Sequence, residues 1–233
     1  MLHRYYHAVG LCSFLFLEIV LFSSILYISN LVEQGKIPFL WGQNIIFWEL
    51  LAIMMHWIVA LNDPGVVCLP RQSYFVSNWK KNPRYCRVCQ TLKTPSVHHC
   101  SKCQVCVMEM DHHCPIVCNC IGLGNRKQFV QLLVYGFFAF FWASVISFYL
   151  YLHDTSGTYP SYMLLFSTVK SAISASILLY LIVEQLCLIS WEIGKLDALH
   201  MGFSIRAKGR KCFRRKPLLL FFGPSCWDWF WPF

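Results

Sequence analysis

The sequence predicts an all-α polytopic membrane protein with four transmembrane helices and a small cysteine-rich loop between the second and third helix. Two observations support this fold class. Hydrophobic residues make up 57% of the 233 residues and charged residues only 13%, about half of the roughly 25% typical of soluble domains. In addition, eight cysteines and four histidines are concentrated in the 35 residues from Cys86 to Cys120. Helices in lipid and one polar segment rich in potential metal ligands explain both observations.

The four spans are expected where the chain approaches the ~20 consecutive apolar residues that a helix needs to cross a bilayer. The first stretch is long for the apolar region of a secretory signal, and no small-residue cleavage site follows it. Buried helices of a soluble protein are the alternative, which the low charged fraction disfavours. A short loop is expected over Leu31–Gly42. The expected spans are about Val9–Ile28, Gln43–Leu61, Val130–Leu152 and Ser167–Ile189.

Lysine and arginine are distributed unevenly around these spans. Nine of the 20 lie within residues 62–128 and eight within residues 190–233. Because Lys and Arg accumulate in cytoplasmic loops, we expect both termini and the cysteine-rich loop to face the cytosol. The anionic surface of the inner leaflet accounts for the net charge of +9, so no nucleic-acid partner is expected.

The predicted organisation has four parts. Residues 1–61 hold the N-terminal tail and the first two helices, and residues 62–128 form the cytosolic cysteine-rich domain. Residues 129–189 hold the last two helices, and residues 190–233 form a cytosolic C-terminal tail. The second span closes at Asp63-Pro64-Gly65, where Pro fixes φ and Gly permits a positive φ, as is typical of a turn.

The cysteine-rich loop has the ligand types and spacing of tetrahedral zinc sites. It contains C-x2-C pairs with histidines between them, and a reducing cytosol keeps such cysteines available as ligands. The loop has too little apolar sequence for a core of its own, so two structural zinc ions would order it. The spacing alone does not decide which residues share a metal. The expected ligands are Cys86, Cys89, His99, Cys100, Cys103, Cys106, His113 and Cys120.

Cys114 remains outside these two metal sites and follows Asp111, His112 and His113 directly. A free cysteine has a pKa of about 8.5, so only a few per cent is thiolate at pH 7. An imidazole base oriented by a carboxylate raises the reactive fraction. We therefore expect Cys114 to be a nucleophile, His112 its base and Asp111 the orienting group, while His113 binds metal. A spare or alternative metal ligand is the other interpretation of Cys114.

These features together resemble the DHHC protein S-acyltransferases, or palmitoyltransferases. The resemblance covers about residues 9–200 and includes the number and order of spans, the Asp63-Pro64-Gly65 turn, all eight ligand positions and Asn125-x3-Phe129. It implies how the metal ligands are divided. The implied sites are Cys86, Cys89, His99 and Cys106 for one zinc, and Cys100, Cys103, His113 and Cys120 for the other.

The resemblance also implies an acyl-CoA-dependent enzyme, a protein-cysteine S-palmitoyltransferase. Cys114 would take a fatty acyl group from acyl-CoA, by default palmitoyl-CoA, as a thioester. It would pass this group to cytosolic cysteines of membrane-associated protein substrates. Lys93 and His98 are candidates to meet the CoA phosphates. Besides these partners we expect membrane lipid around the helices, in the Golgi or endoplasmic reticulum rather than the plasma membrane, with the active site facing the cytosol.

Three positions depart from the family pattern. Ile116 stands where the family usually has Trp, Cys118 where it has Asn, and Gly194-Lys195-Leu196-Asp197 where it has Thr-Thr-x-Glu. These changes favour an alternative function, a catalytically weak relative that acts as a membrane-anchored zinc scaffold or adaptor. The complete Asp-His-His-Cys sequence favours the enzyme. A RING-type ubiquitin ligase would need longer gaps between its ligand pairs.

Overall fold

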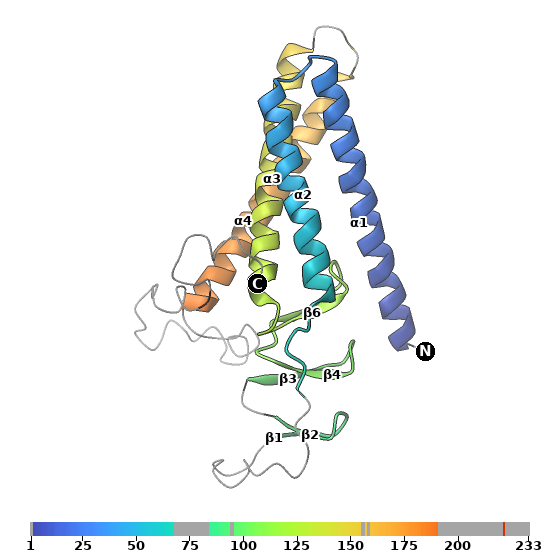
Figure 1. Cartoon of the computed structure of the whole chain (residues 1–233), viewed down its shortest axis with the longest axis vertical. Coiled ribbons are helices and arrows are strands. Elements are labelled where there is room, and N and C mark those ends of the chain that lie inside the picture. Colours follow the sequence, from blue (N-terminus) through green and yellow to red (C-terminus); the bar gives the residue numbers. More distant parts are fainter. Residues whose placement is uncertain are drawn as a thin grey trace. The chain divides into compact units, whose positions relative to one another are not determined.

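The computed structural model combines long helices with a short segment of β-hairpins between α2 and α3 (Figure 1). Of the predicted C-terminal tail, only residues 190 and 221 are described. The departure from the family pattern at Gly194–Asp197 therefore lies outside the described residues. The structure describes residues 2–67, 84–93, 96–154, 157, 159–190 and 221.

The helices of the described chain confirm the predicted fold class. Four helices are long and apolar enough to cross a membrane, the first over Leu15–Glu33. Two groups of cysteine and histidine side chains lie between the second and third helix. The helices are α1 (Leu2–Glu33), α2 (Phe39–Leu61), α3 (Arg126–His153) and α4 (Ser161–Ser190).

The first loop is shorter than the sequence predicts. We expected it to begin at Leu31, but α1 continues to Glu33 and α2 already begins at Phe39. Leu31 is fully buried and packs in an apolar cluster with Ile28 and Ile45. Packing of this kind favours the helix over the loop at its end, because most helical stability comes from burying one face.

The structure divides into two compact units, and each is described by itself. One comprises Leu15–Trp57 and Val130–Gln185, and we call it the membrane unit. Apolar residues form its interior, while many large apolar side chains are exposed, such as Phe16 and Phe166 at 69% and 70%. This exposure is what a bundle surrounded by lipid chains requires, since lipid tails are as apolar as the side chains.

Polar side chains inside the membrane unit are paired across α1 and α2. Glu18 is buried, and its Oε1 lies 2.6 Å from Nδ1 of His56. The hydroxyl of Ser24 donates a hydrogen bond of 2.7 Å to Glu49. Ionisable groups within a membrane are costly unless they pair in the bundle interior. The two contacts therefore explain how α1 and α2 tolerate these acids.

The second unit comprises Met1–Phe14, Ile58–Phe129 and Leu186–Phe233, and we call its residues 58–129 the hairpin unit. Its described strands form three antiparallel pairs of three to four residues per strand. The sequence predicted a metal-ordered loop here but not these hairpins. The strands are β1 (Arg84–Cys86) with β2 (Thr91–Lys93), β3 (Val97–Cys100) with β4 (Val105–Met108), and β5 (His112–Cys114) with β6 (Asn119–Ile121).

The three hairpins have the same design at intervals of 14 residues. The first strand of each ends at a cysteine, and a turn of four residues follows before the second strand. The last residue of each turn has a positive φ, between 51° and 59°. This repeat was not recognised in the sequence. The strand-ending cysteines are Cys86, Cys100 and Cys114, and the positive-φ residues are Gln90, Gln104 and Cys118.

Candidate active site and metal centres

The structure brings the eight predicted ligand residues together in two groups of four, divided as the family resemblance implies. In each group the four ligand atoms lie within 4.8 Å of one another. Three thiols and one imidazole are a donor set typical of structural zinc, and four protein ligands leave no open position. The residues present therefore fit two closed zinc sites.

The first group joins two neighbouring hairpins. Cys86 ends β1 and Cys89 lies in the turn after it, whereas His99 and Cys106 face each other across β3 and β4. Nδ1 of His99 lies 3.6 Å from Sγ of Cys86 and 3.2 Å from Sγ of Cys89. One hairpin thus supplies a C-x2-C turn and the next supplies a cross-strand His–Cys pair.

The second group repeats this arrangement one hairpin further along the chain. Cys100 ends β3 and Cys103 lies in the turn after it, and His113 and Cys120 face each other across β5 and β6. Nδ1 of His113 lies 3.3 Å from Sγ of Cys103 and 3.7 Å from Sγ of Cys120. The hairpins are therefore linked in series through the two groups.

Strand geometry explains why adjacent residues serve different sites. Successive side chains of a strand point to opposite faces. In β3, His99 belongs to the first group and the adjacent Cys100 to the second. In β5, His113 belongs to the second group, so its neighbours His112 and Cys114 lie on the opposite face of the strand. Strand alternation thus divides the two adjacent histidines between a metal site and the thiol.

The two metal-type turns hold the sulfur of their first cysteine with backbone amides. The N–H of Cys89 points to Sγ of Cys86 at 3.4 Å, and the N–H of Cys103 points to Sγ of Cys100 at 3.3 Å. Hydrogen bonds to the charged form of a group favour that form. These amides therefore favour thiolates, the form in which cysteine binds metal.

The third turn has the same amide arrangement around Cys114 but lacks the second cysteine. The N–H groups of Ile116 and Val117 interact with the Cys114 sulfur. The buried Val117 occupies the position that Cys89 and Cys103 hold in the other turns. The next element is α3 rather than another hairpin. Cys114 therefore has the backbone environment of a metal-binding thiolate without belonging to either metal group.

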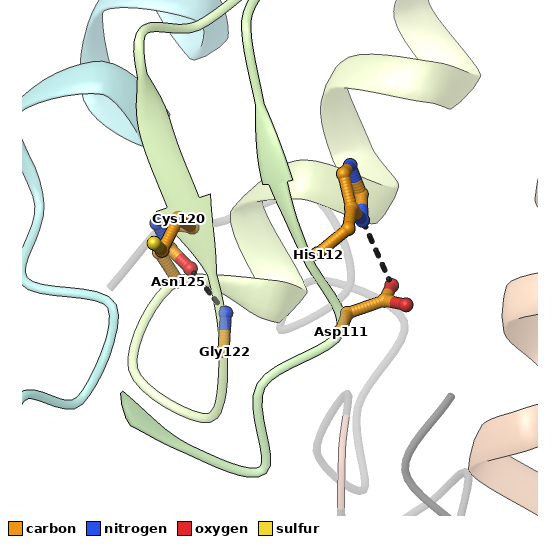
Figure 2. Close-up of polar contacts among 5 residues, drawn as sticks. All are labelled: Asp111, His112, Cys120, Gly122 and Asn125. Carbon is orange, nitrogen blue, oxygen red and sulfur yellow. Dashed lines mark hydrogen bonds and ion pairs between the residues drawn. The ribbon is translucent and has the colours of Figure 1, made fainter. Parts of the chain in front are cut away.

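The side chains of Asp111, His112 and Cys114 form a connected polar series. Oδ2 of Asp111 lies 3.6 Å from Nδ1 of His112 (Figure 2), and the Asp111 side chain is fully buried. Burial alone would lower the pKa of His112, but interactions with Asp111 and Cys114 outweigh it and raise the pKa to about 9. Burial would likewise raise the pKa of Cys114, yet His112 and the turn amides lower it. The environment therefore favours an imidazolium–thiolate pair.

The first turn of α3 packs against this series. The ring of Phe129 contacts the ring of His112 edge-on, with 5.4 Å between their centroids. The guanidinium of Arg126 is buried and interacts electrostatically with Asp111 and Glu109. A buried cation next to Asp111 helps to keep this carboxylate ionised, because opposite charges favour the charged form. The sequence pointed to Phe129 only as part of a family motif, and it gave no signal for Arg126.

Two asparagines connect the third hairpin to α2 and α3. The side-chain amide of Asn119 lies 3.1, 3.2 and 2.8 Å from the carbonyl oxygens of Val59, Ala60 and Asn62, at the end of α2. The side-chain oxygen of Asn125 accepts a hydrogen bond of 3.0 Å from the N–H of Gly122 (Figure 2). The backbone carbonyl of Asn125 accepts another from the N–H of Phe129 in α3. Asn119 thus satisfies carbonyls that a helix end leaves without intrahelical partners.

The Asp63-Pro64-Gly65 turn holds the hairpin unit together beyond ending α2. Oδ1 of Asp63 accepts hydrogen bonds of 2.8 Å from the N–H groups of Gly65 and Val66. The carbonyl of Gly65 accepts the N–H of Met108 in β4. A Cβ on Gly122 would lie 2.4 Å from the Pro64 carbonyl oxygen. Glycine at 122 is therefore required by the close approach of this turn.

The remaining predicted site residues lie in other hairpins or at the third turn. Lys93 is in β2 opposite Arg84, and His98 is in β3 opposite Val107. Both are half-buried and belong to hairpins other than that of Cys114. Ile116, one of the family departures, is 54% exposed.

Comparison with known proteins adds an independent line of evidence. The family model described as DHHC palmitoyltransferase matches residues 80–198, just over half of the chain. Palmitoyltransferase PFA3 of Gibberella zeae is 41% identical over 91 residues, and probable protein S-acyltransferase 13 of Arabidopsis thaliana is 32% identical over 111 residues. Palmitoyltransferase ZDHHC15 of Homo sapiens is 41% identical over 78 residues.

These similarities cover only part of each protein. They involve 37%, 39% and 34% of this chain, and 16%, 37% and 23% of the three relatives respectively. The family model, in contrast, includes both cysteine–histidine groups and the Asp-His-His-Cys sequence. The chain therefore belongs to the DHHC palmitoyltransferase family.

Proposed function

We propose that the chain is a protein S-acyltransferase that moves a fatty acyl group from acyl-CoA, by default palmitoyl-CoA, through a thioester on Cys114 to cysteines of protein substrates. The arrangement of β5 is the observation that supports this most directly. It separates His113, within a metal group, from His112 and Cys114 on the opposite face. A thiol with its own base, outside both closed metal sites, is the arrangement that nucleophilic catalysis needs.

In the first step the Cys114 thiolate attacks the thioester carbonyl of acyl-CoA. A carbon–sulfur bond to Cys114 forms and the bond to the CoA sulfur breaks. The leaving CoA thiolate takes the proton that the His112 imidazolium holds. Asp111 stays ionised and orients the imidazole, the role that a buried carboxylate has in other nucleophile–histidine–acid sites. One thioester replaces another, so the step is nearly isoenergetic.

In the second step a cysteine of the protein substrate attacks the acyl group on Cys114. His112, now neutral, accepts the proton of the substrate thiol as general base. The new thioester forms on the substrate, and Cys114 leaves as a thiolate that the turn amides and the imidazolium favour. The same residues therefore serve both half-reactions.

The two metal groups would each hold one structural Zn²⁺. When bound, zinc supplies only a fixed tetrahedral link between neighbouring hairpins, because its four protein ligands leave no position for water or substrate. Cys114, His112 and Asp111 lie outside both groups. The proposed chemistry is therefore performed by these side chains alone.

The remaining parts of the proposal concern partners and location. Lys93 and His98 would contact the CoA phosphates. Residues 62–128 would face the cytosol, in the Golgi or endoplasmic reticulum, where acyl-CoA and the cysteines of membrane-associated substrates are accessible. The asymmetric distribution of Lys and Arg supports this orientation.

A scaffold or adaptor with weak activity is the second candidate. The observation in its favour is the exposed Ile116 beside the nucleophile, where the family usually has a Trp. Without a large aromatic ring, the wall around a Cys114 thioester would be less complete. This candidate predicts two zinc ions per chain and negligible acyl transfer.

The test is labelling of the purified full chain with a fluorescent fatty acyl-CoA. Wild-type protein should acquire a hydroxylamine-sensitive label, and Cys114→Ser should not. Both proteins should keep two zinc ions. Cys118→Ser is the matched control, since this thiol lies in the turn that follows Cys114 and outside both metal groups; it should label like wild type. Equal labelling of Cys114→Ser and wild type would overturn the nucleophile, and an unlabelled wild type with two zinc ions would favour the scaffold.

A further inference from the structure

The first residue of α3, Arg126, is placed against the electrostatic preference of a helix end. α3 begins at Arg126, and its first turn contains no acidic residue. A helix N-terminus carries a partial positive charge, which stabilises acidic side chains and disfavours cations. Arg126 is nevertheless buried, with only 4% of its surface exposed, so water does not compensate its charge. The position of this cation is therefore explained by groups outside α3.

The groups that compensate Arg126 come from the segment between β4 and β5. The charges of Asp111 and Glu109 both act on the guanidinium. Asp111 is only 1% exposed, and its N–H donates a hydrogen bond of 2.8 Å to the carbonyl of Ile121 in β6. Glu109 is half-buried. A buried carboxylate is costly unless a cation lies beside it, so Asp111 has the greater need of Arg126.

The first turn of α3 is fixed on both sides of Arg126. Asn125, the preceding residue, donates a hydrogen bond of 2.9 Å from its side-chain amide to the carbonyl of Cys120. Phe129 lies three residues after Arg126, which makes the two side chains neighbours on the helix surface. The ring of Phe129 contacts the ring of His112. One turn of helix thus places a cation near Asp111 and an aromatic ring against the next residue.

We propose that Arg126 is a positioning residue for acyl transfer, which holds the Asp111 carboxylate as a charged group so that it orients the His112 imidazole. The inference rests on the proposed function and deepens it. When the CoA thiolate leaves with the proton of His112, the imidazole becomes neutral and no longer compensates Asp111. A guanidinium keeps its charge throughout. Arg126 therefore leaves Asp111 with a cation in the acyl form as well as in the resting form.

The first test compares the stability of Arg126→Met with that of Lys127→Met in the purified full chain. Lys127 is adjacent and half-buried, so both changes remove one positive charge from the first turn of α3. Through the helix dipole, either change should slightly stabilise the helix end. Lys127→Met should therefore keep or raise the denaturant midpoint in detergent. Arg126→Met should lower it, because a buried carboxylate loses its cation, and adding Asp111→Asn should restore about half of that loss or more.

The second test measures the nucleophile without an acyl donor, so its result does not depend on the proposed reaction. Mass spectrometry follows the rate at which iodoacetamide alkylates Cys114 in the same proteins. Arg126→Met should slow alkylation by roughly tenfold, because the thiolate is the reactive form and its imidazole partner is no longer held in place. Arg126→Lys, which keeps the charge, should restore at least about a third of the wild-type rate, and Lys127→Met should match wild type. In an Asp111→Asn background, Arg126→Met should cause little further slowing.

Equal stability and reactivity of Arg126→Met and Lys127→Met would overturn the proposal. So would a loss that persists undiminished with Asp111→Asn, or one that Glu109→Gln abolishes instead, because Arg126 would then act through another group. If Arg126→Met does not fold, recovery of folded protein by Asp111→Asn supports the proposal and failure to recover contradicts it. A wild-type protein that shows these differences but takes no acyl label would count against acyl transfer and not against the role of Arg126 toward Asp111.

Discussion

The second and third hairpins have nearly the same backbone but different chemistry. In each, the first strand ends at a cysteine, a turn of four residues follows, and the last turn residue has a positive φ. In the second hairpin the third turn residue is Cys103, a member of a metal group, and Gln104 is the last. In the third hairpin the equivalent residue is the buried Val117. The difference indicates that one missing ligand turns a metal-binding turn into one with a free, amide-stabilised thiol.

The largest expected effect is the difference in zinc content and folding between variants of the two adjacent histidines of β5. His113→Ala removes a zinc ligand, and a structural zinc contributes on the order of 10 kcal/mol to folding. This variant should therefore lose zinc and soluble, folded protein. His112→Ala should keep two zinc ions but slow autoacylation by roughly 10²-fold or more, the usual effect of losing a general base. Zinc analysis and labelling rates check both variants. Equal zinc loss in the two would refute the assignment of His113 to the metal and of His112 to the thiol.

The next prediction adds to the third turn the cysteine that the first two turns have at the equivalent position. It tests whether the missing ligand alone distinguishes the third turn from the second. In Val117→Cys the turn would read C-x2-C, with His112 nearby as a third ligand. Added zinc should lower acyl labelling of this variant by at least about tenfold, because a zinc-bound thiolate is withheld from the acyl donor. Wild type should be unaffected, and a chelator at low concentration should restore labelling. Insensitivity of Val117→Cys to zinc would show that the third turn lacks the geometry of the other two.

The anchoring of the third hairpin distinguishes it from the second in a measurable way. Asn119 takes the position that Val105 holds in the second hairpin. Asn119→Val removes the donor that satisfies carbonyls at the end of α2 and should lower the free energy of unfolding by about 2–3 kcal/mol. Denaturant unfolding in detergent measures this loss, with zinc content unchanged at two. A loss below about 0.5 kcal/mol would mean that water replaces the amide at little cost.

The smallest expected effect concerns the last residue of the third turn. Cys118 has a φ of 54°, a conformation that costs ordinary residues roughly 1–2 kcal/mol and that Asn adopts more readily. Cys118→Asn should therefore raise the free energy of unfolding by up to about 1 kcal/mol. Labelling of Cys114 should stay within the range of wild type. A lower stability would show that the Cys118 side chain makes contacts that outweigh the strain.

Much of this protein was predictable from the sequence because its features are local. Apolar stretches of sufficient length predict spans, and the C-x2-C spacing with nearby histidines predicts zinc ligands. Cys114 could be singled out because the other motif residues were needed elsewhere. The division of ligands between the two sites followed from the family resemblance. Its physical reason, the alternation of side chains in β3 and β5, is visible only in the structure.

Other features could not be predicted for physical reasons. Strands of three or four residues are too short to show a hydrophobic periodicity that would reveal them. The role of Asn119 depends on contacts with residues 57 to 60 positions away. The end of α1 was misplaced because the burial of Leu31 depends on packing with α2, including Ile45.

The central claim is that Cys114 is a nucleophile in a turn of the metal-binding type that holds no metal. The most direct measurement compares Cys114→Ser with Cys100→Ser, the same change at the equivalent position of the second hairpin, for zinc content and acyl labelling on the same samples. We predict that Cys100→Ser loses about one zinc of two, whereas Cys114→Ser keeps both and forms no hydroxylamine-sensitive label. Loss of zinc from Cys114→Ser, or wild-type labelling of that variant, would contradict the account.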